Sequence, residues 1–269
     1  MQTVILDDLT IGYTAKGNEK VVARGLNAAI NSGELTCLLG QNGIGKSTLL
    51  RTLSAFLPKL GGDIILNTSQ TSAPRPLTSF TDQQLSRMIG VVLTEKLAIK
   101  NMSAEELIGM GRAPYTGFWG RLTEEDHQVV HDAIRLVGIE PLAGRMIQTL
   151  SDGERQKVMI AKALAQQTPI IYLDEPTAFL DYPSKVEMMQ LLRRLAVQEQ
   201  KTIFLSTHDV ELSLQVADCI WLMEPDQLCV GTPHQLAEQG ALSRFIEREG
   251  ITFDRGSLTI RVAPAARLS

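Results

Sequence analysis

Cysteine and histidine are scarce in this chain of 269 residues, which has 3 cysteines and 4 histidines. Cys37, Cys219 and Cys229 lie in apolar, strand-like runs without metal-ligand spacing, so we interpret them as buried thiols of a reducing compartment. His127 and His131 share an expected helix, but two ligands alone do not form a zinc site. The sequence therefore predicts neither a disulfide framework nor a metal site built on these residues.

A basic surface and long apolar runs are also lacking. The chain has 26 Lys and Arg against 30 Asp and Glu, a formal net charge of −4, so nucleic acid is not an expected partner. No stretch approaches the roughly 18 uninterrupted apolar residues of a membrane span, and residues 1–8 lack the charged and apolar regions of a signal peptide. We therefore expect a cytoplasmic protein that reaches a membrane only when a partner holds it there.

The chain has enough apolar sequence for a large core, 44% of its residues, in stretches of different character. Residues 3–40 contain short strand-like segments, residues 81–165 are mainly helical, and residues 169–223 alternate between expected strands and helices. Such alternation predicts an α/β fold with a mostly parallel sheet and helices packed on it. Residues 232–269 are expected to form one or two short helices and a final β-like segment at 257–262.

A nucleotide-binding pattern, G-x-x-x-x-G-K-[ST], begins at Gly40. An apolar run typical of a buried strand precedes it and a helical segment follows it, which is the context that the pattern requires. Its glycines let backbone N–H groups face a polyphosphate. Lys46 is expected to reach the β- and γ-phosphates, and Ser47 to bind Mg²⁺. The predicted ATP contacts are Gly40, Gln41, Asn42, Gly43, Ile44, Gly45, Lys46, Ser47 and Thr48.

Two carboxylates, Asp174 and Glu175, follow the apolar run 170–173. Mg²⁺ needs an ordering group at the carboxyl end of a strand that neighbours the phosphate loop, so Asp174 is the candidate metal residue. Glu175 is then placed to polarise the attacking water. The alternative is a strand that simply ends in a solvated acidic turn.

Residues 150–154, Leu-Ser-Asp-Gly-Glu, open an expected helix. Ser151 and Glu154 fit a capping box, which by itself would account for both residues. A serine-capped helix start with Gly153 beside it also suits a bound anion. This segment alone does not decide between a cap and a binding site.

Taken in order, these segments resemble the ATP-binding-cassette (ABC) ATPases over nearly the whole chain. Residues 150–154 resemble the signature motif of that family, with Asp152 and Glu154 in place of the commonest Gly and Gln. Residues 178–181 resemble the D-loop and residues 206–209 the switch-histidine segment, while Tyr13 resembles the aromatic A-loop residue that stacks on adenine.

The resemblance implies a P-loop NTPase core with an N-terminal antiparallel β-subdomain and an inserted α-helical subdomain at about 81–165. The ABC ATPase domain would span residues 1–231, and residues 232–269 would form a short C-terminal extension.

The resemblance also implies a nucleotide-sandwich homodimer, in which ATP on the loop of one subunit is closed over by its partner. The catalytic residues would be Glu175, His208, which holds the γ-phosphate, and Lys46. The residues that would contact ATP in trans are Ser151, Asp152, Gly153, Glu154 and Asp181.

One position departs from the family pattern. A Gln normally ends the strand that leads into the helical subdomain and contacts Mg²⁺ and the water, but Thr94 stands at that position, followed by Glu95. Thr94 offers a hydroxyl with a shorter reach and is kept as the candidate metal contact. Glu95 is the alternative substitute, or a solvated loop carboxylate.

Residues 109–115, Gly-Met-Gly-Arg-Ala-Pro-Tyr, resemble the importer ATPases for ferric siderophores, haem and vitamin B12. The resemblance implies two permease subunits that dock near residues 94–120, a periplasmic binding protein that acts indirectly, and a peripheral location at the cytoplasmic face of a bacterial inner membrane. No heptad run separates Lys46 from Ser151, which excludes cassettes interrupted by coiled coils. A single-cassette iron–sulfur cluster assembly ATPase stays open as the alternative.

Overall fold

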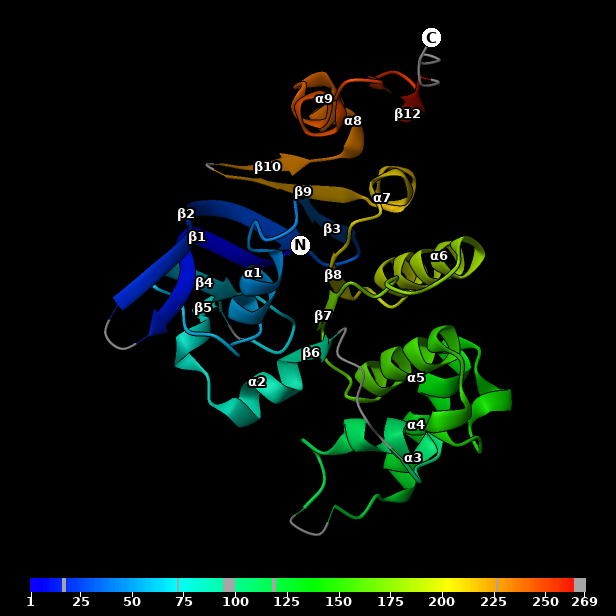
Figure 1. Ribbon diagram of the computed structural model, residues 1–269. Helices are drawn as coiled ribbons and strands as arrows, with labels where there is room; N and C mark the ends of the chain where they lie inside the picture. Colours follow the sequence, from blue (N-terminus) through cyan, green and yellow to red (C-terminus); the bar gives the residue numbers. More distant parts are fainter. Residues whose placement is uncertain (16–17, 72, 94–99, 118–119, 226, 264–269) are drawn as a thin grey trace.

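The computed structural model describes residues 1–15, 18–71, 73–93, 100–117, 120–225 and 227–263. A central sheet separates one group of helices at one end of the molecule from a C-terminal group at the other (Figure 1). The first group is α3 (Ala104–Gly109), α4 (Glu124–Val137) and α5 (Asp152–Ala165), and the second is α8 (Pro233–Glu238) and α9 (Ala241–Ile246). An antiparallel sheet built from the N-terminal part covers one side (Figure 1). Within these ranges, none of the helices combines the length and apolarity that crossing a membrane demands.

The N-terminal sheet is antiparallel, with strand order β2-β1-β4-β5. Its strands are β1 (Gln2–Ala15), β2 (Asn18–Asn31), β4 (Gly61–Leu66) and β5 (Arg75–Pro76). The short strand-like segments expected within residues 3–40 include β1, whose register is irregular between Leu6 and Leu9. Asp8 has a φ of 48° at this point, so Leu6 and Leu9 both face the core although an even strand would place them on opposite sides.

The central sheet has the strand order β10-β9-β3-β8-β7-β6. Its strands are β3 (Leu35–Gly40), β6 (Ile89–Val92), β7 (Ile170–Asp174), β8 (Thr202–Ser206), β9 (Cys219–Glu224) and β10 (Gln227–Gly231). All neighbouring pairs are parallel except β9 with β10. Because parallel strands share one carboxyl edge, Gly40, Asp174 and Ser206 end at the same side of the sheet. The sequence suggested that the strand carrying Asp174 neighbours the strand that leads into the phosphate loop. In the structure the two strands, β7 and β3, are not adjacent, because β8 lies between them.

Nine α-helices are assigned within the described ranges. They are α1 (Lys46–Leu53), α2 (Asp82–Met88), α3 (Ala104–Gly109), α4 (Glu124–Val137), α5 (Asp152–Ala165), α6 (Tyr182–Gln198), α7 (Val210–Val216), α8 (Pro233–Glu238) and α9 (Ala241–Ile246). Helix α1 packs between the two sheets, with Leu49, Leu50 and Leu53 in one buried cluster with Tyr172 and Phe204. A second buried cluster joins α3, α4, α5 and α6 to the opposite face of the central sheet.

Strand β6 lies inside the range 81–165 that the sequence predicts as the helical subdomain. It pairs with β7 as an edge strand of the central sheet, because its short apolar run is buried there. The next helix, α3, is capped by Ser103, and the boundaries of the helical subdomain stay a prediction.

The C-terminal extension packs on the core. Its helices α8 and α9 are followed by a hairpin of β11 (Ile251–Asp254) and β12 (Thr259–Val262), so the expected short helices and final β-segment are confirmed. Leu236, Leu242 and Phe253 of the extension share a buried cluster with Ile220 and Leu222 of β9.

Candidate active site

The loop between β3 and α1 is shaped for close approach of a ligand. Gly43 has a φ of 76° and Gly45 a φ of 118°, a backbone conformation that side-chain-bearing residues rarely adopt. A Cβ on Gly45 would overlap with the side chain of Val22. Gly45 is the N-cap of α1, and within the described residues no side chain caps this helix. The first N–H groups of α1 are therefore left for a ligand, whereas α5 is closed by a capping box.

Lys46 is held inside this loop. Its Nζ donates hydrogen bonds to the carbonyl oxygens of Gly40 at 2.8 Å and Gln41 at 3.1 Å, and the residue is only 6% exposed. Burial lowers the pKa of Lys46 below its ordinary 10.5, while Glu175 and Asp174 act in the opposite direction. A phosphate that enters the loop meets a desolvated cation that is already positioned.

Asp174 and Glu175 face the loop from the end of β7. Ser47 Oγ lies 3.4 Å from Asp174 Oδ1, so a hydroxyl and a carboxylate converge as Mg²⁺ ligands do, and this oxygen donor set fits that ion. His208 Nε2 lies 2.6 Å from Glu175 Oε1. The structure therefore brings together the side chains that the sequence proposed separately from three different segments.

Ser206 is a residue of this site that sequence reasoning did not single out. Its hydroxyl donates to Asp174 Oδ1 at 2.6 Å and accepts the backbone N–H of Glu175 at 3.1 Å, and the same N–H also reaches the Ser206 carbonyl oxygen. Glu175 has a φ of 48°, a strained conformation that these contacts hold in place. In the sequence, Ser206 stands at the end of an apolar strand as the first residue of the switch-histidine segment 206–209, without a role of its own.

A cavity of about 710 Å³ lies at this site. Tyr13, residues 42–48 of the loop, Glu175 and His208 line it, and Tyr13 is 41% exposed, with its hydroxyl 2.7 Å from Thr48 Oγ1. The volume is in the range of small-molecule and cofactor sites. One subunit thus presents a phosphate loop, an aromatic ring and a carboxylate–histidine pair in one hollow.

The predicted trans residues lie elsewhere. Among the described residues, the lining of this cavity contains none of the segment 151–154 and not Asp181. Ser151 caps α5 and Asp181 caps α6, where its Oδ1 accepts the N–H of Ser184 at 3.1 Å. Gly153 lies beside Leu180, since a Cβ on Gly153 would be 3.6 Å from Leu180 Cδ2. The signature segment and the D-loop are therefore neighbours of each other, apart from the loop of the same chain.

The family to which this chain belongs is shown by its sequence. The sequence profile of the family described as ABC transporter matches residues 23–178, more than half of the chain. The chain belongs to the ATP-binding subunits of ABC transporters. It is therefore an ATPase that binds nucleotide, and cassettes of this family work as dimers with membrane permease partners. The resemblance and the fold class inferred from the sequence are confirmed.

Relatives cover nearly the whole cassette. The uncharacterized ABC transporter ATP-binding protein MJ0873 of Methanocaldococcus jannaschii is 37% identical over 248 residues, which cover 92% of this chain and 82% of the relative. The iron(3+)-hydroxamate import ATP-binding protein FhuC of Bacillus subtilis is 34% identical over 210 residues, 78% and 74% of the two chains. A solved structure of a metal-chelate type ABC transporter in an inward-facing conformation shares the fold, with a TM-score of 0.77 at 24% identity and 99% coverage of both chains.

Thr94 and Glu95, at the position of the family Gln, lie outside the described residues. Phe118 and Trp119 of the expected docking loop also lie outside them. The contact between Thr94 and Mg²⁺ stays a prediction.

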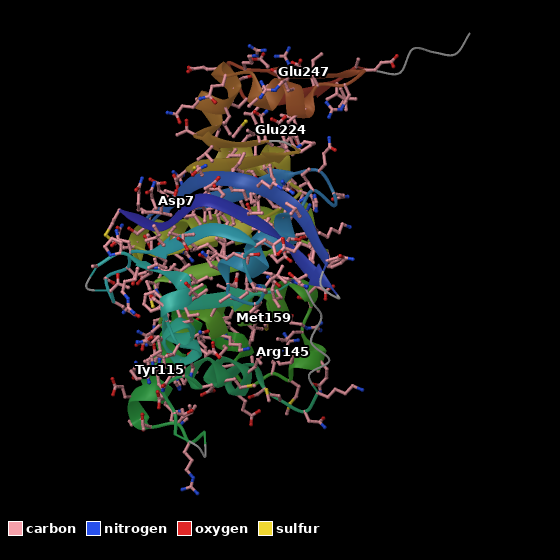
Figure 2. The ribbon with its side chains drawn as sticks, turned by 90° about the vertical axis from the view of Figure 1, so that its left-hand side faces the viewer. Asp7, Tyr115, Arg145, Met159, Glu224 and Glu247 are labelled. Carbon is pink, nitrogen blue, oxygen red and sulfur yellow. The ribbon has the colours of Figure 1, made fainter. Side chains whose placement is uncertain are left out.

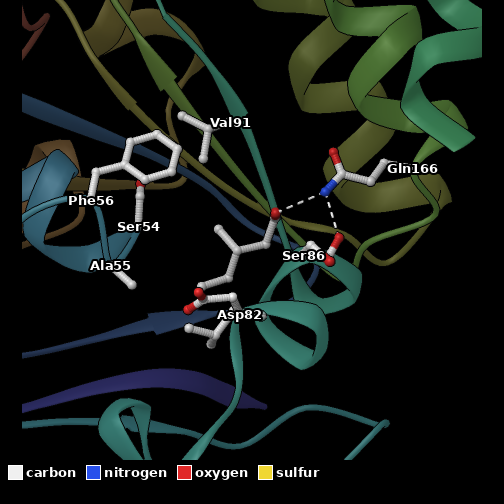
Figure 3. A pocket seen from close by; sticks show the side chains of 9 residues that line it. Ser54, Ala55, Phe56, Asp82, Ser86, Val91 and Gln166 are labelled. Atoms are coloured by element: carbon white, nitrogen blue, oxygen red, sulfur yellow. Dashed lines mark hydrogen bonds between the residues drawn. The ribbon is translucent and has the colours of Figure 1, made fainter. Parts of the chain in front are cut away.

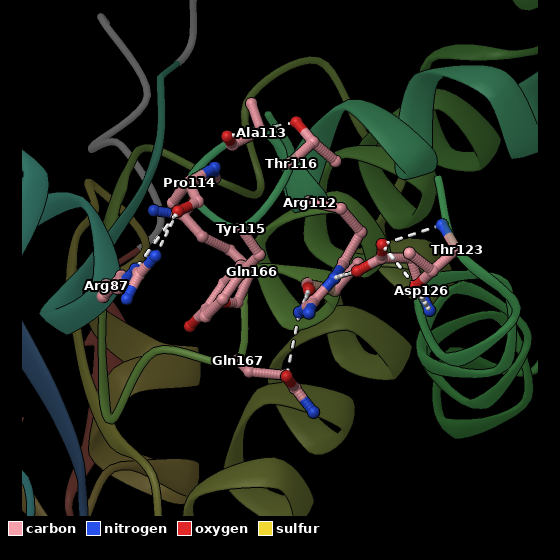
Figure 4. Close-up of polar contacts among 11 residues, drawn as sticks. Arg87, Arg112, Ala113, Pro114, Tyr115, Thr116, Thr123, Asp126, Gln166 and Gln167 are labelled. Atoms are coloured by element: carbon pink, nitrogen blue, oxygen red, sulfur yellow. Dashed lines mark hydrogen bonds and ion pairs between the residues drawn. The ribbon is translucent and has the colours of Figure 1, made fainter. Parts of the chain in front are cut away.

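The segment 109–115 joins the helical part of the cassette to its core. Arg112 is 5% exposed; its Nε bonds Asp126 Oδ1 and its Nη1 bonds the carbonyl oxygen of Ala165, each at 2.8 Å (Figure 4). The Tyr115 ring lies between the guanidinium groups of Arg112 and Arg87, with centroid distances of 4.0 and 4.9 Å. The sequence singled out this segment as a family marker, and the structure supplies its physical role as a clasp around the end of α5.

Proposed function

We propose that this cassette is the ATP-hydrolysing subunit of a bacterial importer for a metal chelate such as a ferric siderophore, haem or cobalamin. The Bacillus subtilis relative is named for iron(3+)-hydroxamate import, which supports iron-chelate cargo. Segment 109–115 supports the same class through its resemblance to the importer ATPases for ferric siderophores, haem and vitamin B12.

In this proposal Lys46 and the N–H groups of the loop bind the β- and γ-phosphates, while Tyr13 stacks on adenine. Ser47 and Asp174 would hold Mg²⁺, which when bound would supply positive charge beside the phosphate oxygens. Glu175 polarises the attacking water, and His208 moves between Glu175 and the γ-phosphate. The contact of 2.6 Å between His208 and Glu175 supports this assignment, since it places the histidine beside the carboxylate that polarises the water.

The second half of the site comes from a partner cassette. Segment 151–154 and Asp181 are grouped away from the cavity that holds the loop, which supports a contact made in trans with ATP between the subunits. A helix start that faces a phosphate from the partner adds favourable partial charge to the closed dimer.

The permease is proposed to dock at a groove beside segment 109–115. This groove has a volume of about 460 Å³ and is lined by residues that follow α1, by α2, by β6 and by Gln166 at the end of α5 (Figure 3). Phe56 on its rim is 61% exposed, as expected for an apolar contact with a short helix of a partner. Gln166 Nε2 donates to the carbonyl oxygens of Ser86 and Ile89, so movement of the groove reaches α5 directly. Such docking would hold the cassette at the cytoplasmic face of the membrane.

The observation that carries the proposal is that Lys46, Glu175 and His208 line one cavity, whereas the signature segment at the start of α5 does not line it. Its test is Glu175→Gln, which keeps the size of the side chain and removes its basicity. We expect the variant to bind ATP, to lose most turnover, and to accumulate as a dimer with ATP in size-exclusion chromatography. Near-normal turnover would refute the assignment of Glu175.

Cargo is tested separately in cells. A strain in which this gene carries Glu175→Gln should lose uptake of radiolabelled ferric hydroxamate, ferric catecholate, haem or cobalamin, with Glu187→Gln as a surface control. Normal uptake of all four chelates together with lowered activity of iron–sulfur enzymes would overturn import and favour a cluster assembly ATPase.

A further inference from the structure

The signature segment of this cassette is acidic, which is at odds with its proposed place over a polyphosphate. Asp152 and Glu154 stand where the family most often has Gly and Gln, and in the sandwich both would approach the γ-phosphate of the partner subunit. Each carboxylate would repel the nucleotide at short range in a site that excludes water. The inference below rests on the proposed sandwich dimer.

Glu154 folds back on the start of α5. Its Oε2 accepts the backbone N–H of Ser151 at 2.8 Å and the Ser151 hydroxyl at 3.0 Å. These bonds, and secondarily Arg145, lower the pKa of Glu154, so the carboxylate is charged at neutral pH. A hydroxyl has a single proton to donate. Ser151 therefore cannot donate to a γ-phosphate while it donates to Glu154.

Arg145 faces the other oxygen of the same carboxylate. Its Nη1 lies 3.0 Å from Glu154 Oε1, and its Nη2 donates to the carbonyl oxygen of Thr149 at 2.9 Å, just before the signature segment. Asp152 has a looser partner, with 3.7 Å between its Oδ1 and Arg155 Nη1. Arg145 lies on the helical part of the molecule, far from the C-terminal extension that carries Glu247 (Figure 2).

We propose that Arg145 is a positioning residue that makes the acidic signature compatible with ATP. It neutralises Glu154 and holds that carboxylate back, so that Ser151 is released to the γ-phosphate of the partner subunit when the dimer closes. Arg145 and Glu154 are 43% and 33% exposed in the single chain, where such a pair contributes little to stability. Closure of the dimer removes water from the pair, so the interaction between Arg145 and Glu154 affects the ATP concentration at which the dimer forms.

The proposal predicts a charge-dependent pattern in ATP-driven dimerisation. In the Glu175→Gln background, Arg145→Ala should raise the ATP concentration for half-maximal dimer roughly tenfold, as expected for a coupling of this kind. Glu154→Gln should lower it, since the repulsive charge is removed. The double variant, Arg145→Ala with Glu154→Gln, should behave like Glu154→Gln alone, because Arg145 then has no charge to neutralise.

Multi-angle light scattering across an ATP titration measures these values. Arg135→Ala is the matched control, because Arg135 forms an exposed pair with Asp132 on α4 at 3.4 Å. It should leave dimerisation unchanged. Thermal unfolding followed by circular dichroism verifies that each variant is folded. If Arg145→Ala is not folded, Arg145→Met replaces it, because methionine keeps the aliphatic part of the side chain.

Two results would overturn the inference. If Arg145→Ala weakens dimerisation equally with and without the Glu154→Gln substitution, Arg145 acts on the nucleotide or on the loop before α5 and not through Glu154. If neither single variant changes the half-maximal ATP concentration, the pair has no role in closure. Failure of Glu175→Gln itself to dimerise with ATP would instead refute the sandwich on which the inference rests.

Discussion

Replacing Asp126 by asparagine removes the carboxylate that faces the buried guanidinium of Arg112 and keeps the size of the side chain. Asp126 accepts hydrogen bonds from the Thr123 N–H at 3.0 Å, the Thr123 hydroxyl at 2.8 Å and Arg112 Nε at 2.8 Å. Both side chains of the ion pair are less than a tenth exposed, at 6% for Arg112 and 8% for Asp126. The substitution therefore leaves Arg112 as a buried charge without its carboxylate.

The expected loss of stability follows from the pKa of Asp126. The Thr123 N–H first, and then Arg112, lower this pKa from 3.8 to about 2. At about 1.4 kcal/mol per pH unit, this difference contributes about 2 kcal/mol to the free energy of unfolding at neutral pH. Breaking one side of a buried ion pair typically costs about 3 to 5 kcal/mol. We expect Asp126→Asn to lose about 2 to 4 kcal/mol.

The pH dependence of the stability loss tests whether the ionised carboxylate of Asp126 is its cause. Because the pKa is lower in the folded state, the contribution is fully present above the unfolded value of 3.8 and is lost only as the pH falls toward about 2. The difference between wild type and Asp126→Asn should therefore stay constant from pH 8 to pH 5.

Urea unfolding followed by circular dichroism at several pH values measures this difference. The control is Asp132→Asn, which removes an exposed pair with Arg135 and should cost less than about 0.5 kcal/mol. A loss below about 1 kcal/mol for Asp126→Asn, or a loss that changes between pH 8 and pH 5, would refute the reasoning.

Two further substitutions test the site. Lys46→Ala should weaken ATP binding at least tenfold in isothermal titration, because it removes the buried cation of the loop; unchanged affinity would contradict its role. In the wild type, bound phosphate favours charged Lys46 and burial lowers its pKa, so ATP affinity should fall as the pH rises through that pKa on the alkaline side. Ser206→Ala should lower kcat at least tenfold and leave ATP affinity in EDTA unchanged, because it frees Asp174 and the Glu175 backbone; an unchanged kcat would show that the carboxylates hold their positions without it.

The sequence by itself determined the parts of this protein that depend on neighbouring residues. The phosphate loop, the end of β7 with its carboxylates, and the capping box at Ser151 are each built within a few consecutive positions. Residues 169–223, which were expected to alternate between strands and helices, contain β7, α6, β8, α7 and β9, and β9 extends beyond them only by Glu224. Local spacing and apolar runs decide such features, so they can be read without tertiary contacts.

The tertiary structure alone decided which residues meet. Ser206 contacts both Asp174 and Glu175 because β8 lies between β3 and β7. No spacing of residues along the chain predicts that strand order. Arg145 reaches Glu154 from a loop, and Arg112 reaches Asp126 across the helical subdomain. These contacts depend on how strands are ordered and helices are packed, which sums many weak interactions over the whole core. For that reason the sequence identified the residues of the site, and the tertiary structure determined which charged side chains contact one another.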